Sequence, residues 1–100
     1  MSWATHYITK LRNGESVSFR PRGNSMSGKI KSGSVCFVKP ISDYSDLKTG
    51  DIVLCKVKGG DYLHLIKAIR GNQYQIGNNH GHINGWVTSN NIFGKLQSVI

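Results

Sequence analysis

The chain has 100 residues, which is enough for one compact domain with a single modest core. No run of about 18 apolar residues occurs, and the N-terminus lacks the charged-then-apolar order of a secretory signal. The sequence therefore predicts one domain over residues 1–100, no membrane span, no export and a cytoplasmic location.

The net charge is +8, and it is unevenly distributed. Residues 1–40 contain seven basic residues and one acidic residue, whereas residues 41–100 contain six basic and four acidic residues. A basic half attracts anionic partners, because cations that approach phosphates release counterions. Charge alone thus favours a nucleic acid or an acidic protein as a partner.

One helix is predicted at the N-terminus, over residues 1–14. Apolar side chains recur there at helical spacing from Trp3 to Leu11, Ser2 can cap the start, and Asn13-Gly14 ends the pattern.

The remaining residues, 15–100, have the pattern of an all-β domain. Short runs rich in β-branched and aromatic residues are separated by glycine turns, at residues 15–20, 34–39, 51–57, 62–69, 73–76 and 92–99. Hairpin signals at 59–61 and 70–72 predict an antiparallel meander of the three runs between 51 and 76. The polar segment 77–85 is expected to be a surface loop. The fold class is therefore mainly β, with short antiparallel strands in a partly open barrel or sandwich.

The two cysteines lie in apolar runs, SVCFV and DIVLCKV. A thiol in such a run behaves as a small hydrophobic group, so Cys36 and Cys55 are expected to be buried and reduced.

A serine in a glycine-rich basic loop is the first candidate for chemistry. The stretch RPRGNSMSGKIKSG places Ser25 after the small residues Gly23 and Asn24 and before Met26. A nucleophilic serine needs a base, backbone donors for the oxyanion and a turn that exposes its hydroxyl, and this turn leaves the Ser25 amide free to donate. Serine beside glycine is also ordinary turn chemistry.

Several separated pieces occur in one order along the chain: GNSMSGKIKSGSVCFV, LKTGDIVLCKV, YLHLIKAI, YQIGNN and NIFGKL. Together they resemble the serine peptidase superfamily that contains signal peptidases and the self-cleaving domain of LexA-type repressors, and the resemblance runs from about residue 23 to 96. The resemblance implies the fold of that superfamily, with Ser25 as nucleophile and His64 as general base. It implies no cofactor. A bacterial or phage origin would suit it.

The alternation of strand 62–69 also singles out His64. Tyr62, His64 and Ile66 share one face, whereas Lys67 lies on the other, so Lys67 cannot replace His64 without a bulge. A histidine with a pKa near 6.5 is mostly neutral at pH 7, as a base must be, whereas a lysine would need a shift of roughly 3 units.

The sequence departs from the pattern of this superfamily at two acidic positions. Ser34 replaces the acid of the first Gly-Asp pair, and Asn78 replaces the acid that serves as a third catalytic member in histidine-type relatives. Asn78 can orient the imidazole by a hydrogen bond, but it supplies no full charge to the imidazolium. Gly23 stands where bacterial signal peptidases place an oxyanion-hole hydroxyl, which leaves a backbone donor.

Other polar groups suggest binding. His80 and His82 have a spacing compatible with zinc, but neither cysteine has a partner at CxxC spacing, so no metal site is predicted. Four cations surround the serine and form a candidate anion-binding rim: Arg20, Arg22, Lys29 and Lys31.

Two functions of different class follow. The first is a serine peptidase with a Ser25–His64 dyad that cleaves a peptide or protein bound in extended form. Its activity could be full, weak or vestigial. The second is a non-catalytic module of the same fold that binds nucleic acid or an acidic protein through the basic N-terminal half.

Overall fold

The computed structural model describes residues 2–100 as one helix and seven strands, with two short 3-10 turns. All strands pair antiparallel in a single sheet of order β1-β2-β7-β3-β4-β5-β6. The predicted fold class, mainly β with one N-terminal helix, is confirmed. No helix among residues 2–100 is long and apolar enough to cross a membrane. The elements are α1 (Thr5–Arg12), β1 (Val17–Phe19), β2 (Cys36–Pro40), β3 (Ile52–Val57), β4 (Gly60–Arg70), β5 (Gln73–Gly77), β6 (Ile83–Thr88) and β7 (Ile92–Val99).

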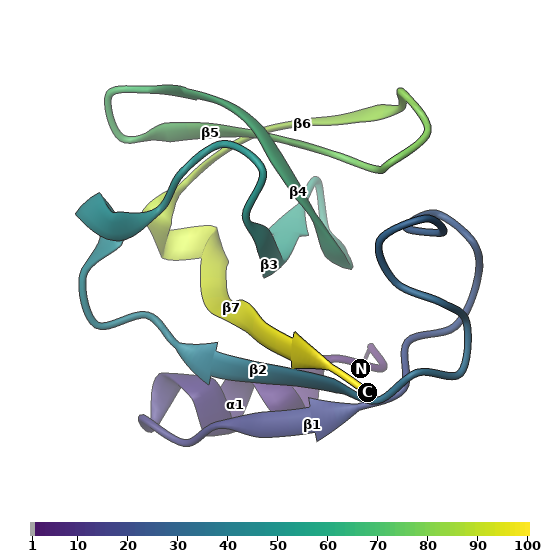
Figure 1. Ribbon diagram of the computed structural model, residues 1–100. Coiled ribbons are helices and arrows are strands. Elements are labelled where there is room, and N and C mark those ends of the chain that lie inside the picture. Colours follow the sequence, from purple (N-terminus) through teal and green to yellow (C-terminus); the bar gives the residue numbers. More distant parts are fainter. Residues whose placement is uncertain (1) are drawn as a thin grey trace.

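The helix is shorter than predicted at its N-terminal end. It begins at Thr5 with Ala4 as the N-cap, so the prediction that Ser2 caps the helix is wrong. The Ser2 hydroxyl accepts the Ala4 amide and the Ser2 carbonyl accepts the Thr5 amide. The helix packs against β1, β2 and β7 and buries Ile8 and Leu11 there. In Figure 1 it lies behind β1 and below β2.

The predicted meander of β3, β4 and β5 is confirmed. A two-residue turn, Lys58 and Gly59, joins β3 to β4, and both residues have positive φ angles, 51° and 83°, as a type I′ hairpin requires. Gly71 and Asn72 join β4 to β5 by a second two-residue connection, in which Gly71 alone has a positive φ angle, 60°.

The sequence prediction missed one strand. Residues 77–85 were expected to form a loop, but the loop is confined to 78–82 and β6 begins at Ile83. The Asn84-Gly85 pair has the composition of a turn, yet here it lies inside a strand, at a register shift where β6 has one more residue than β5. A β-bulge of this kind accommodates residues that would otherwise signal a turn.

The two central strands are buried on both faces. Leu54, Leu63 and Leu65 belong to one apolar cluster, which also contains the buried side chains of α1. Their alternating neighbours Val53, Cys55 and Ile66 belong to a second cluster on the other face. Burying a leucine or isoleucine side chain contributes about 1.5–3 kcal/mol, so β3 and β4 form a rigid base for the side chains they carry.

Both cysteines are buried and free, as predicted. Cys36 lies on β2 and Cys55 on β3, and β7 separates these strands in the sheet. Burial raises the pKa of the Cys55 thiol to about 12, so the group is a neutral hydrophobic side chain.

Candidate active site

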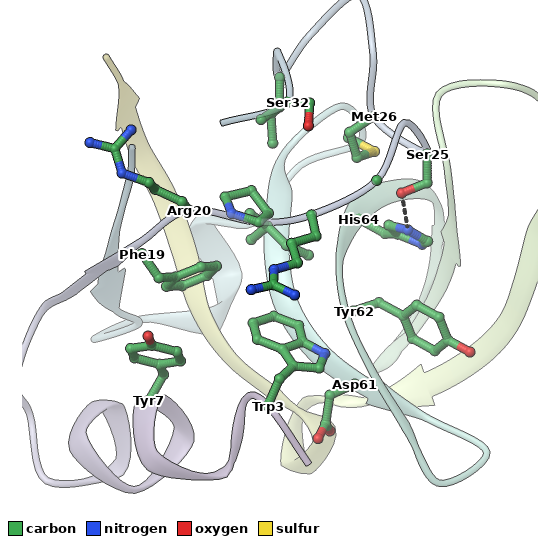
Figure 2. Close-up of a pocket in the computed structure, with 15 residues that line it drawn as sticks. Trp3, Tyr7, Phe19, Arg20, Ser25, Met26, Ser32, Asp61, Tyr62 and His64 are labelled. Atoms are coloured by element: carbon green, nitrogen blue, oxygen red, sulfur yellow. Dashed lines mark hydrogen bonds between the residues drawn. The ribbon is translucent and has the colours of Figure 1, made fainter. Parts of the chain in front are cut away.

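Ser25 and His64 come together although 39 residues separate them. The serine lies in the long loop between β1 and β2, and the histidine lies on β4. The Ser25 Oγ is 3.1 Å from the His64 Nε2, a hydrogen-bond distance, as the dashed line in Figure 2 shows. The serine is exposed, whereas only 6% of the histidine is exposed.

The other nitrogen of the imidazole is held by Asn84. The Nδ1 of His64 lies 2.7 Å from the Asn84 Oδ1. Because an amide oxygen only accepts, Nδ1 carries the proton and Nε2 presents a lone pair to the Ser25 hydroxyl. This is the tautomer that a general base needs.

The prediction that Asn78 orients the imidazole is wrong, because Asn84 has that position. The Oδ1 of Asn78 accepts the backbone N–H groups of His80 and His82, at 2.8 and 3.0 Å, so its side chain closes the loop between β5 and β6. Asn84 reaches His64 because β5, the strand between them, ends at Gly77, and because Asn84 is the extra residue of the bulge in β6. The sequence contained one signal for this strand, the β-prone run Trp86-Val87-Thr88 that follows.

Burial determines the protonation of His64. Loss of solvent lowers its pKa below the usual 6.5, and the nearby His82 lowers it further, whereas the hydrogen bond that His64 donates to Asn84 raises it. Tyr62 covers the imidazole at 4.9 Å between ring centroids. His64 is therefore neutral at pH 7.

The turn around Ser25 leaves its amide available. The Asn24 carbonyl accepts the Ser27 amide at 3.1 Å, and the Met26 carbonyl accepts the amides of Lys29 and Ile30. Within residues 2–100, the amide of Ser25 itself donates no hydrogen bond to another group. The side chain of Met26 is 5% exposed and anchors the turn in the core.

Glycines on both sides permit this turn. Gly23 and Gly28 have φ angles of +93° and +94°, in the left-handed region that glycine adopts without steric cost.

A groove with a volume of about 510 Å³ opens beside Ser25 and His64. Its apolar wall contains an aromatic cluster in which Phe19 contacts Tyr7 and Trp3, with ring centroids 4.7 and 5.5 Å apart. Figure 2 shows this cluster at one end of the groove and the Ser25–His64 pair at the other. The groove is thus long enough to extend from the hydroxyl to an aromatic surface.

The predicted basic rim is only partly at the groove. Arg20 and Arg22 line it, whereas Lys29 and Lys31 are exposed and do not. The Arg20 Nη1 donates to the Gly33 carbonyl at 2.5 Å and thereby joins the two ends of the serine loop. Ser34, which replaces an acid of the family pattern, lies after this point and outside the groove.

One of the two histidines considered for zinc has other side-chain partners. His80 Nε2 lies 2.9 Å from the Asn24 carbonyl oxygen and 2.7 Å from the Ser27 Oγ. Among residues 2–100, no three His, Cys, Asp or Glu side chains are grouped as metal ligands would be.

No protein-family model matches this chain, and no curated protein matches it significantly.

Proposed function

We propose that this protein is a serine peptidase of the signal-peptidase and LexA-like kind, with Ser25 as nucleophile and His64 as general base. One observation carries the proposal: the Ser25 Oγ and the His64 Nε2 are 3.1 Å apart, and the imidazole is held from its other side at 2.7 Å by Asn84. A serine, a base within hydrogen-bond reach and a third group on the base are the arrangement of an activated nucleophile.

In the first half of the reaction, the Ser25 Oγ attacks the carbonyl carbon of the substrate, and its proton moves to the His64 Nε2. The π electrons move to the carbonyl oxygen, where the Ser25 amide stabilises the negative charge. The intermediate collapses, the C–N bond breaks, and Nε2–H protonates the leaving amine. Water then cleaves the acyl-enzyme, with His64 again as the base.

The groove supports an extended peptide as substrate. β1 is an edge strand of the sheet, and it leads through Phe19 and Arg20 into the groove that ends at Ser25. Edge strands bind extended chains through their free backbone groups. The aromatic wall favours a large apolar side chain, and the arginines favour acidic residues close to the cleavage site. We place the reaction in the cytoplasm of a bacterium or of a cell infected by a phage.

A fluorophosphonate probe tests the proposal directly. The Ser25 Oγ should form a bond to phosphorus and release fluoride, with the proton accepted by His64. We expect labelling of the wild type that is abolished in Ser25→Ala, lost by at least a hundredfold in His64→Gln, and that rises with pH through a midpoint below 6.5. Equal labelling of Ser25→Ala would exclude the proposal.

The alternative function is a module that binds nucleic acid without catalysis. The net charge of +8 and an amide in place of a third carboxylate favour it. Binding to generic DNA or RNA would then weaken steeply with the logarithm of the salt concentration. Labelling of Ser25 together with weak, salt-insensitive binding would exclude this alternative.

A further inference from the structure

We propose that His80 is a positioning residue that sets the direction of the Ser25 amide, the donor to the oxyanion. The inference rests on the proposed function and assigns a role to a residue outside the Ser25–His64–Asn84 group. It starts from one hydrogen bond, between the His80 Nε2 and the Asn24 carbonyl oxygen, 2.9 Å apart.

The peptide unit between residues 24 and 25 connects this bond to the site. The Asn24 C=O and the Ser25 N–H belong to the same planar group, and no peptide bond in residues 2–100 is cis. In a trans peptide the C=O and N–H point in opposite directions. The Asn24 carbonyl accepts the Ser27 amide within the turn at 3.1 Å, and His80 is its donor from the facing loop. The bond from His80 directs the Ser25 N–H away from that loop.

The chemistry of the partners shows which ring nitrogen of His80 carries a proton. A carbonyl oxygen only accepts, so the His80 Nε2 carries a proton, and the Ser27 hydroxyl at 2.7 Å accepts from the same N–H. Nε2–H is present in the imidazolium and in one of the two neutral tautomers. His80 can hold the carbonyl in either protonation state.

The loop that carries His80 is itself held in place. Asn78 closes it by accepting the amides of His80 and His82, and its own amide donates to the His82 carbonyl at 2.9 Å. The neighbouring Asn79 adds two bonds to the serine turn, from its amide to the Ser25 carbonyl at 3.0 Å and from its Nδ2 to the Ser27 carbonyl at 2.8 Å. Residues 79 and 80 together bind three carbonyls of the turn.

The position of this loop in the fold suggests why it matters. It connects β5 to β6, and β6 carries Asn84 on His64. In Figure 1 the end of the β5–β6 hairpin lies beside the loop between β1 and β2. One connection thus holds the base through Asn84 and the oxyanion donor through His80, so both are in place before a substrate arrives.

Two substitutions that differ in the donor test the role. His80→Gln keeps an N–H at the end of the side chain, whereas His80→Met has similar length and no donor. Fluorophosphonate labelling of wild type and both variants gives the rate at saturation and the half-saturating concentration separately. Removal of a whole oxyanion donor costs about 10²–10³ in rate, so a misdirected one should cost at least tenfold.

We expect His80→Met to lower the saturating rate at least tenfold with an unchanged half-saturating concentration, and His80→Gln to recover most of it. The pH midpoint, which belongs to His64, should stay in place in both. Wild-type rates in His80→Met would overturn the role of His80 and leave the proposed function standing. Absence of labelling in the wild type would overturn both.

A measurement without turnover checks the bond itself. Two-bond ¹H–¹⁵N spectra of the wild type, at a pH well above the usual imidazole pKa of about 6.5, report which ring nitrogen carries the proton. We expect the Nε2–H tautomer for His80 and a displaced Ser25 amide resonance in His80→Met. The Nδ1–H tautomer, or an unmoved Ser25 resonance, would contradict the proposal.

Discussion

The amide of Asn84 offers the sharpest test of the site, because a substitution of nearly the same size, Asn84→Asp, replaces a neutral group with a negative charge. In Asn84→Asp a carboxylate replaces the amide whose Oδ1 lies 2.7 Å from the His64 Nδ1. The imidazolium that forms during the reaction would then face a full negative charge. The same carboxylate would stabilise the protonated histidine of the free protein and so raise the pKa of His64.

The size of the effect follows from the strength of the hydrogen bond. A bond to a charged group contributes about 1.5–3 kcal/mol, against about 0.5–1.5 kcal/mol for a neutral pair. The difference, about 1–1.5 kcal/mol, corresponds to a roughly fivefold to thirteenfold faster reaction at high pH. Asn84→Ala removes the neutral bond and frees the ring, so it should slow the reaction about tenfold.

The assay is the rate of fluorophosphonate labelling from pH 4.5 to 9. For Asn84→Asp we expect a higher plateau and a midpoint moved to higher pH, because the base works only when it has lost its proton. For Asn84→Ala we expect a lower plateau and a midpoint moved to lower pH, because the Asn84 bond raises the pKa of His64. Wild-type plateaus and midpoints in both variants would refute the assignment of Asn84 to the imidazole.

Three further predictions concern stability, thiol reactivity and substrate choice. Folding lowers the pKa of His64, so the unfolded chain binds more protons below about pH 6.5. Stability should therefore fall as the pH drops from 6.5 through the folded-state pKa. The urea midpoints measured at pH 5 and pH 7.5 should differ less in His64→Gln than in the wild type. The buried Cys55 thiol, with a pKa of about 12, should react with a thiol reagent at pH 8 only after denaturation; rapid reaction of the native protein would contradict its burial. In Arg22→Glu, labelling or cleavage of probes with acidic residues should weaken at least fivefold relative to basic ones, and an unchanged preference would exclude Arg22 from substrate recognition.

Much of the fold could be predicted because its signals are local. The turn residues at 58–59 and 71–72 join strands that are neighbours in both sequence and space, so short-range rules suffice for the meander. Local signals also explain why β6 was not predicted. Asn84-Gly85 has the local chemistry of a turn, and only pairing with β5 makes it a bulge within a strand.

Ser25 and His64 could be proposed because the order of the sequence pieces resembles signal peptidases and LexA-type repressors, and the alternation of one strand supports His64. Their contact depends on the position of the loop between β1 and β2 relative to β4, which no local pattern encodes. Asn78 was the expected third member because Gly77-Asn78 stands where the similar peptidases have Gly-Asp. Its side chain bonds within its own loop, and Asn84 faces the histidine across the end of β5.

The sequence by itself determined the helix, most of the strands and the burial of the cysteines, because these depend on periodicity, turns and residue chemistry. It proposed the two residues of the candidate dyad through a resemblance to signal peptidases and LexA-type repressors. Only the tertiary structure decided that Asn84 holds the base and that His80 holds the serine turn. Both contacts join segments that lie on different strands and loops, at least 20 residues apart. Such pairs come together only when the sheet order is complete, and the free energy that selects them comes from packing across the whole core.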